Sequence, residues 1–140
     1  MPIQIKYLDN ETGVMLIAEG TITADDIIIS IQTLFSSTEK MKQLKYCLMD
    51  YSNNTQLNVS NANLRVIADL NKKASVEKQE GVVAIVANND FVFGISRMWE
   101  FFIDNAGVPW ETMVFRDKGK AENWIKQKVS DRGSLDIAVS

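Results

Sequence analysis

The stretch Lys45–Leu70, KYCLMDYSNNTQLNVSNANLRVIADL, decides how the rest of the chain is interpreted. It begins with a continuous apolar run, Tyr46–Met49, which is typical of a strand covered on both faces. Asp50 ends the run, and a polar segment leads from it to Ser60, which stands where the N-cap of a helix belongs. The pattern predicts a central strand, a polar loop and a helix. In open α/β sheets, sites lie in the loops at the carboxyl ends of such strands.

The residues before this stretch predict an antiparallel hairpin and one helix. Apolar and polar residues alternate over Ile3–Leu8, and Val14–Ala18 supplies a second strand after a turn rich in Asp, Asn and Gly. Glu19-Gly20 is expected to end that strand. Thr23 is expected to cap a helix with one apolar stripe, and a charged connector then leads to the Tyr46 strand.

Strands and helices alternate after the central stretch. The expected elements are a helix from about Asn61 into the Lys72–Lys78 region, the strand Val82–Ala87, the helix Phe91–Asn105, the strand Trp110–Phe115 and a helix capped by Asp117. Arg132-Gly133 is expected to break the last helix, so that residues 1–130 form a single domain and residues 131–140 a C-terminal tail. This order predicts an α/β fold with a mixed five-stranded sheet, an N-terminal antiparallel hairpin followed by β-α units, and about four helices.

Composition excludes several classes of protein. The net charge is −3 and the Lys and Arg residues are scattered, which argues against nucleic acid as a partner. No apolar run approaches the ~20 residues of a transmembrane segment, so none is expected. The only cysteine, Cys47, excludes a disulfide framework and favours a cytoplasmic location.

The absence of histidine narrows the chemistry further. Without it, Ser-His-Asp and Cys-His catalysis and the commonest transition-metal ligand are excluded. No glycine-rich phosphate cradle is present, since neither GxGxxG nor GxxxxGK[ST] occurs. We therefore expect no catalytic residue, no metal and no cofactor, and an enzyme ranks last among the functions considered.

Several short phrases, taken in order along nearly the whole chain, carry a resemblance to a known family. They are Gly20-x-Ile22-Thr23, Leu48-Met49-Asp50-Tyr51-Ser52, Phe93-Gly94-Ile95-Ser96-Arg97-Met98, and Val114-Phe115-Arg116-Asp117 followed by Ala121-x-x-Trp124. With these phrases the chain resembles the SpoIIAA-like branch of the STAS superfamily, which is related to Sec14-like lipid-binding domains. The resemblance implies a non-catalytic cytoplasmic regulatory or protein-interaction module, like the anti-sigma-factor antagonists.

The resemblance also implies a regulatory loop that contains Asp50, Ser52 and Ser60. In phosphoregulated members a partner kinase modifies a serine at the start of the helix after the Asp-ended strand, and Ser60 holds that position here. This chain has Asn58-Val59-Ser60-Asn61 where the family motif is Asp-Ser-Ser-Gly. The residues alone allow two simpler interpretations: Ser60 is an N-cap, and Asp50 accepts hydrogen bonds from its own loop.

The helix Phe91–Asn105 is unusually aromatic. One face, made of Phe91, Ile95, Met98, Trp99, Phe102 and Ala106, is expected to be core. A second row, Phe93, Arg97 and Phe101, predicts a homodimer, partner or ligand surface, because aromatic residues and arginine are enriched in such contacts. The alternative is that a neighbouring helix or the tail covers these rings.

Two further hypotheses concern ligands. Asn88, Asn89 and Asp90 follow the Val82 strand and, together with the Asp50 loop, could line a small polar pocket; the alternative is that they only cap the next helix. The kinship with Sec14-like domains and the aromatic helix suggest a carrier of a small apolar ligand or lipid. Such a carrier needs a cavity of a few hundred Å³.

Overall fold

A computed structural model describes the backbone of residues 2–139 and the side chains of residues 2–131. Its elements are β1 (Ile3–Leu8), β2 (Gly13–Thr23), α1 (Ala24–Leu34), α2 (Thr38–Gln43), β3 (Tyr46–Asn58), α3 (Asn61–Glu77), β4 (Val82–Val86), α4 (Asp90–Ala106), β5 (Glu111–Phe115) and α5 (Lys118–Val139). The strands form one sheet in the order β1-β2-β3-β4-β5. β1 and β2 are antiparallel, and all other neighbours are parallel. The expected mixed five-stranded α/β fold with its N-terminal hairpin is confirmed.

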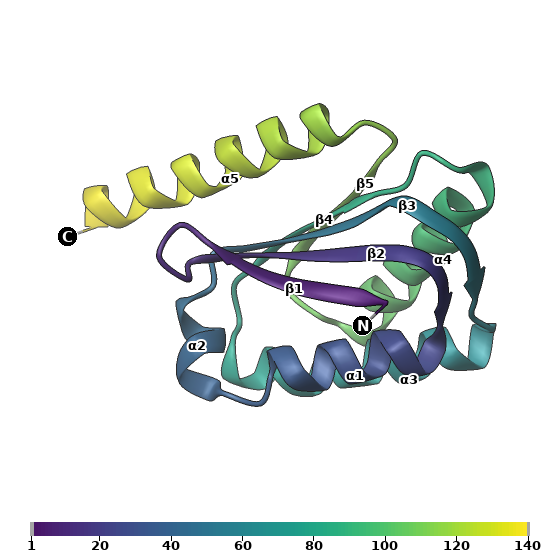
Figure 1. Cartoon of the computed structure of the whole chain (residues 1–140). Coiled ribbons are helices and arrows are strands. Elements are labelled where there is room, and N and C mark those ends of the chain that lie inside the picture. Colours follow the sequence, from purple (N-terminus) through teal and green to yellow (C-terminus); the bar gives the residue numbers. More distant parts are fainter. Residues whose placement is uncertain (1, 140) are drawn as a thin grey trace.

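Helices cover both faces of the sheet. α1, α3 and α4 pack on one face and α5 packs on the other; in Figure 1, α1 and α3 lie below the strands and α5 lies above them. Because side chains alternate along a strand, Cys47, Met49 and Tyr51 of β3 join the three-helix side and Leu48 joins the α5 side. β4 is buried at all five positions, as its apolar run predicts.

β2 and β3 are both longer than the sequence predicts. The expected polar loop after Asp50 continues β3 to Asn58, and β2 runs past Glu19-Gly20 to Thr23. The two extensions pair with each other, with Thr23 opposite Asn58, across two register shifts. Polar side chains do not prevent this pairing because the ladder is made by backbone groups. The predicted boundaries were therefore wrong at the ends of both strands.

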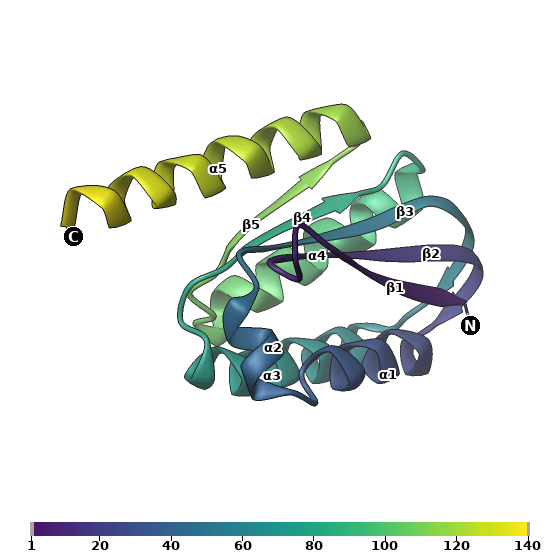
Figure 2. The same ribbon diagram turned by 60° about the vertical axis from the view of Figure 1, so that its left-hand side comes forward.

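The helices differ from expectation at two places. The charged connector before β3 contains a short helix, α2, which Ser37 caps by accepting a hydrogen bond from the Lys40 N–H. The described backbone thus has five helices instead of about four. The expected break at Arg132-Gly133 is also wrong, since α5 continues to Val139. A single glycine costs a helix only ~1 kcal/mol, which is too little to end it. Figure 2 shows the C-terminal half of α5 extending beyond the strands.

The predicted helix caps are confirmed. Thr23 and Ser60 each form a capping box with the residue three positions later. Asn89 accepts hydrogen bonds from two N–H groups of the first turn of α4, and Gly107 ends that helix with a φ of +76°. No helix within the described residues is long and apolar enough to cross a bilayer.

Candidate functional site

The carboxyl ends of β4 and β5, together with the part of β3 beside them, gather the charged residues that sequence reasoning singled out and two that it missed. Asp50 is buried near the middle of β3, where its Oδ1 accepts a hydrogen bond from the Ser52 N–H at 2.9 Å. Its Oδ2 lies 3.4 Å from the Lys118 Nζ of α5. Both oxygens are thus occupied by the protein itself, and the expected local hydrogen bond to Asp50 is present.

Asp50, Ser52 and Ser60 do not lie in one loop, as the sequence analysis expected. Ser52 lies within β3, whereas Ser60 caps α3 beyond the end of the strand. Asn58 lies six residue steps of ~3.3 Å along the strand from Ser52, a span on the order of 20 Å. The Ser60 hydroxyl accepts a hydrogen bond from the Asn63 N–H at 3.1 Å. Its position at a helix N-terminus is confirmed, and the geometry is that of an N-cap.

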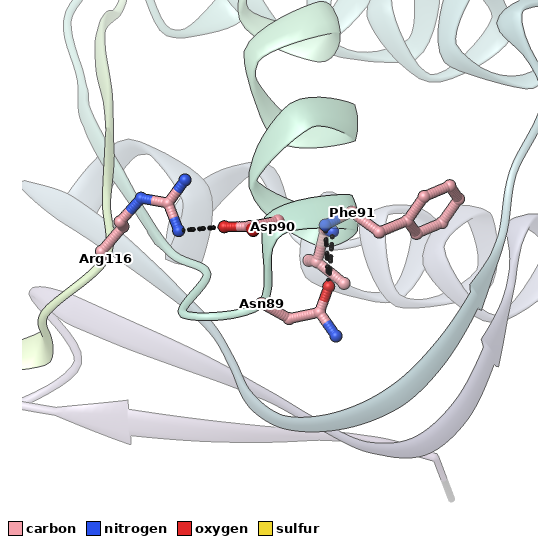
Figure 3. A network of polar contacts seen from close by, with 5 residues as sticks. Asn89, Asp90, Phe91 and Arg116 are labelled. Atoms are coloured by element: carbon pink, nitrogen blue, oxygen red, sulfur yellow. Dashed lines mark hydrogen bonds and ion pairs between the residues drawn. The ribbon is translucent and has the colours of Figure 1, made fainter.

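Asn88, Asn89 and Asp90 follow β4 at the same edge, and Figure 3 shows Asn89 and Asp90. Asn89 Oδ1 accepts from the Phe91 N–H at 2.8 Å and the Val92 N–H at 3.2 Å, and is therefore used as a cap. Asp90 pairs with Arg116, whose Nη1 lies 2.6 Å from Asp90 Oδ1. Asn88 is exposed.

Arg116 also covers part of the aromatic row of α4. Its guanidinium carbon lies 4.2 Å from the centre of the Phe93 ring, within the range of a cation–π contact. The sequence signal for Arg116 and Lys118 was their place directly after β5, at the sheet edge that already held Asp50 and Asp90. Their pairing could not be read from the sequence because their partners come from distant parts of it.

The outer face of α4 is apolar and uncovered within the described structure. Phe91, Met98 and Phe101 are 60%, 36% and 62% exposed, and space for a Cβ at Gly94 is open. The buried side of the helix is formed instead by Val92, Ser96, Trp99 and Ile103. The expected core face was therefore rotated: Phe91 and Met98 were assigned to the core and lie outside it.

Along the predicted row Phe93, Arg97 and Phe101, the side chains become more exposed toward the C-terminal end of α4. Phe93 is half-buried beneath Arg116, whereas Phe101 is exposed and contacts Phe102 edge-on, with ring centres 5.9 Å apart. Arg97 Nε lies 3.6 Å from Glu100 Oε1. Desolvation raises the pKa of Glu100 above its usual value, against the opposing effect of Arg97.

A cavity of about 90 Å³ lies between the sheet and the three-helix layer. Its walls are mostly aliphatic and aromatic side chains, and Cys47 and Tyr51 of β3 are among them. Burial raises the pKa of the Cys47 thiol to about 12, so the thiol is protonated and unreactive at neutral pH. Burial raises the pKa of Tyr51 as well.

The charged side chains at this edge of the sheet contact other groups of the protein. The carboxylates at the sheet edge are held in ion pairs or caps, and no group of three or more Cys, Asp or Glu residues within the described chain is placed to hold a metal ion. Strands follow each other in chain order, so no reversal opens the crevice in which doubly wound sheets bind ligands.

The architecture is that of a small α/β domain, and comparison with solved structures specifies its type. An uncharacterised protein of the DUF3478 family from Shewanella loihica PV-4, described as having a SpoIIAA-like fold, superposes with a TM-score of 0.54 and 22% sequence identity. The match covers 88% of this chain and 91% of that one. The chain therefore has a SpoIIAA-like fold, as its sequence phrases indicated. No protein-family model and no curated protein matches it.

Proposed function

We propose that the protein is a non-catalytic cytoplasmic interaction module, and that it pairs with a second copy of itself through the outer face of α4. The observation that carries the proposal is the exposure of Phe91, Met98 and Phe101 on one side of a single helix. Exposed aromatic side chains that gather on one face are characteristic of contact surfaces. The SpoIIAA-like fold, in which the family resemblance implies regulation by binding, supports the same function.

The residues on this face suit a two-fold pair. Phe91 and Phe101 lie at equal distances along α4 from Ser96, and so do Gly94 and Met98. If two copies of α4 cross in opposite directions near Ser96, Phe91 meets Phe101 of the second copy and Met98 fills the open space at Gly94. A two-fold interface requires such self-complementarity, in which the same patch contacts itself.

Light scattering on purified protein tests the proposal. The wild type is expected to have twice the mass of one chain. The double variant Phe91→Ser/Phe101→Ser should be a folded monomer, because removing two central aromatic anchors typically costs an interface at least 2 kcal/mol each. Val76→Ser, which changes an exposed apolar residue on α3, should leave the dimer intact.

Circular dichroism and thermal melting distinguish the relevant outcomes. A wild-type monomer at micromolar concentration would refute the pairing. A double variant that unfolds would mean that Phe91 and Phe101 support the fold. In that case, Gly94→Gln, which places a long side chain at the centre of the face without removing any contact, should dissociate the pair.

The phosphoregulation that the resemblance implies would act at a different place. Ser60 is exposed at the N-terminus of α3, where a phosphate is favoured by the helix dipole. We propose Ser60 as the regulated position in preference to Ser52. Ser52 lies half-buried within β3, where a phosphate would have to be accommodated inside the sheet.

A lipid-carrying function receives less support. The cavity beneath the sheet measures about 90 Å³, whereas ligand sites for molecules of drug size or larger occupy ~300–1,000 Å³. An acyl chain therefore does not fit without a large rearrangement of α1, α3 and α4.

A further inference from the structure

Residues of the central strand β3 line the cavity between the sheet and the three-helix layer. Cys47 and Met49 lie in the middle of the sheet beneath the helices, yet both retain accessible surface. Both residues line the cavity, which accounts for that surface. At these two residues, therefore, the side chains of β3 are not fully covered by the helices above them.

Three polar side chains line this apolar space. Tyr51 of β3, Asn71 of α3 and Ser96 of α4 are only 6%, 6% and 4% exposed. Among residues whose side chains are described, none provides a hydrogen-bond partner for these three side chains. Buried polar groups nearly always have partners, and leaving one without a partner costs ~1–3 kcal/mol.

The polar atoms of these three side chains are not fully enclosed by the protein. Within the described side chains, the one fully enclosed oxygen or nitrogen that lacks a partner is Asn54 Oδ1, which lies elsewhere on β3. The polar atoms of Tyr51, Asn71 and Ser96 thus keep contact with open space, and the cavity is the space that they line. A molecule in the cavity would supply the missing hydrogen bonds.

We propose that the cavity is a binding site for a small neutral molecule that has an apolar body and one hydrogen-bonding oxygen, such as a short-chain ketone or alcohol. An apolar cavity of 150 Å³ holds benzene, with six carbons, so about 90 Å³ admits about four non-hydrogen atoms. The apolar walls receive the carbon part. The Tyr51 hydroxyl donates to the oxygen, and a charged ligand is disfavoured because desolvating it would cost several kcal/mol.

The rim of the cavity lies near the amino ends of β3 and β4. Lys45, just before β3, is exposed and also lines the cavity, so the site extends to solvent there. Trp110 closes this end: its indole N–H donates to the Lys78 carbonyl at 2.7 Å, and its ring lies 6.0 Å from that of Phe35. Gly81 allows the closure, because a Cβ there would approach Trp110 to 3.0 Å.

Methyl-detected NMR with acetone and, separately, with xenon tests the site. In the wild type both probes should cause saturable shifts of the Met49 methyl signal, with a dissociation constant for acetone in about the millimolar range. Tyr51→Phe should weaken acetone binding about three- to tenfold, the loss of one hydrogen bond. The same substitution should leave xenon binding unchanged, because xenon accepts no hydrogen bond.

Filling the cavity provides the second arm of the test. Cys47→Leu should abolish the shifts caused by both probes while the remaining spectrum stays native; if it unfolds the protein, Ser96→Val serves instead. The monomeric Phe91→Ser/Phe101→Ser protein should bind acetone normally, so failure of the α4 pairing leaves this inference standing. Unsaturable shifts in the wild type would mean that the cavity holds only water. Full acetone affinity in the filled variant would mean that acetone binds elsewhere, and either result would overturn the proposal.

Discussion

Glu100 is a carboxylate whose ionisation opposes folding. Desolvation raises its pKa above 4.5 in the folded protein, so the folded state binds the proton more tightly than the unfolded state does. The contribution of Glu100 to the free energy of unfolding is consequently most favourable below pH 4.5, where the carboxyl group is protonated in both states. It declines as the pH rises through the raised pKa.

Replacing this carboxylate should therefore stabilise the protein. Glu100→Gln is expected to increase the free energy of unfolding at neutral pH and to have no such effect well below pH 4.5. The ion pair that it removes, with the exposed Arg97, contributes little. Urea unfolding at the two pH values measures the difference. A variant less stable than wild type at neutral pH would show that the Arg97 contact outweighs desolvation.

At the scale of single residues, the sequence predicted local roles better than partnerships. Ser60 as a cap and the hydrogen bond from the Ser52 N–H to Asp50 follow from neighbours two or three positions away. The contacts of Lys118 with Asp50 and of Arg116 with Asp90 join residues far apart in the chain, and no local pattern encodes them. Asn71 and Ser96 did carry a signal: each is a polar residue at a core-facing helical position.

At the scale of elements, the cap of α3 offers a direct test. Ser60→Ala removes the acceptor for the Asn63 N–H and should lower the free energy of unfolding by ~1 kcal/mol. Ser60→Asp retains an acceptor and adds charge that the helix dipole favours, so it should restore most of the stability. Urea unfolding of the three proteins gives the comparison; equal losses in both variants would contradict a capping role.

Element types were predicted well, whereas their edges and faces were not. The polar residues from Ser52 to Thr55 are typical of a loop, yet this segment is part of β3, which pairs with β2 through its backbone. Most of its side chains are not buried, so polar residues are tolerated there. In α4 the aromatic residues outnumber the core positions. Periodicity alone could not choose between the stripe with Phe91 and Met98 and the stripe with Val92 and Ile103.

At the scale of the whole molecule, the described packing of α5 comes from its first half. Ala121 and Ile125 are buried against the sheet, and Trp124 and Val129 pack beside them. We therefore propose that the folded domain ends near residue 130. A chain shortened after Asp131 should keep its fold, with the free energy of unfolding lowered by less than ~0.5 kcal/mol. A larger loss in urea unfolding would place part of the core beyond that point.

The sheet order has a consequence for how the protein is made. Every strand lies beside the one that precedes it in the chain, from β1 to β5. During synthesis, each new strand can therefore join an edge that is already present, without waiting for a later segment to be inserted between earlier ones. The parallel pairs still join residues that lie far apart in the chain, such as Val14 with Cys47 and Cys47 with Val83, and pairing over such distances slows folding. α5 follows β5 in the chain, so the face of β3 and β4 that it covers can be buried only after all five strands have been made.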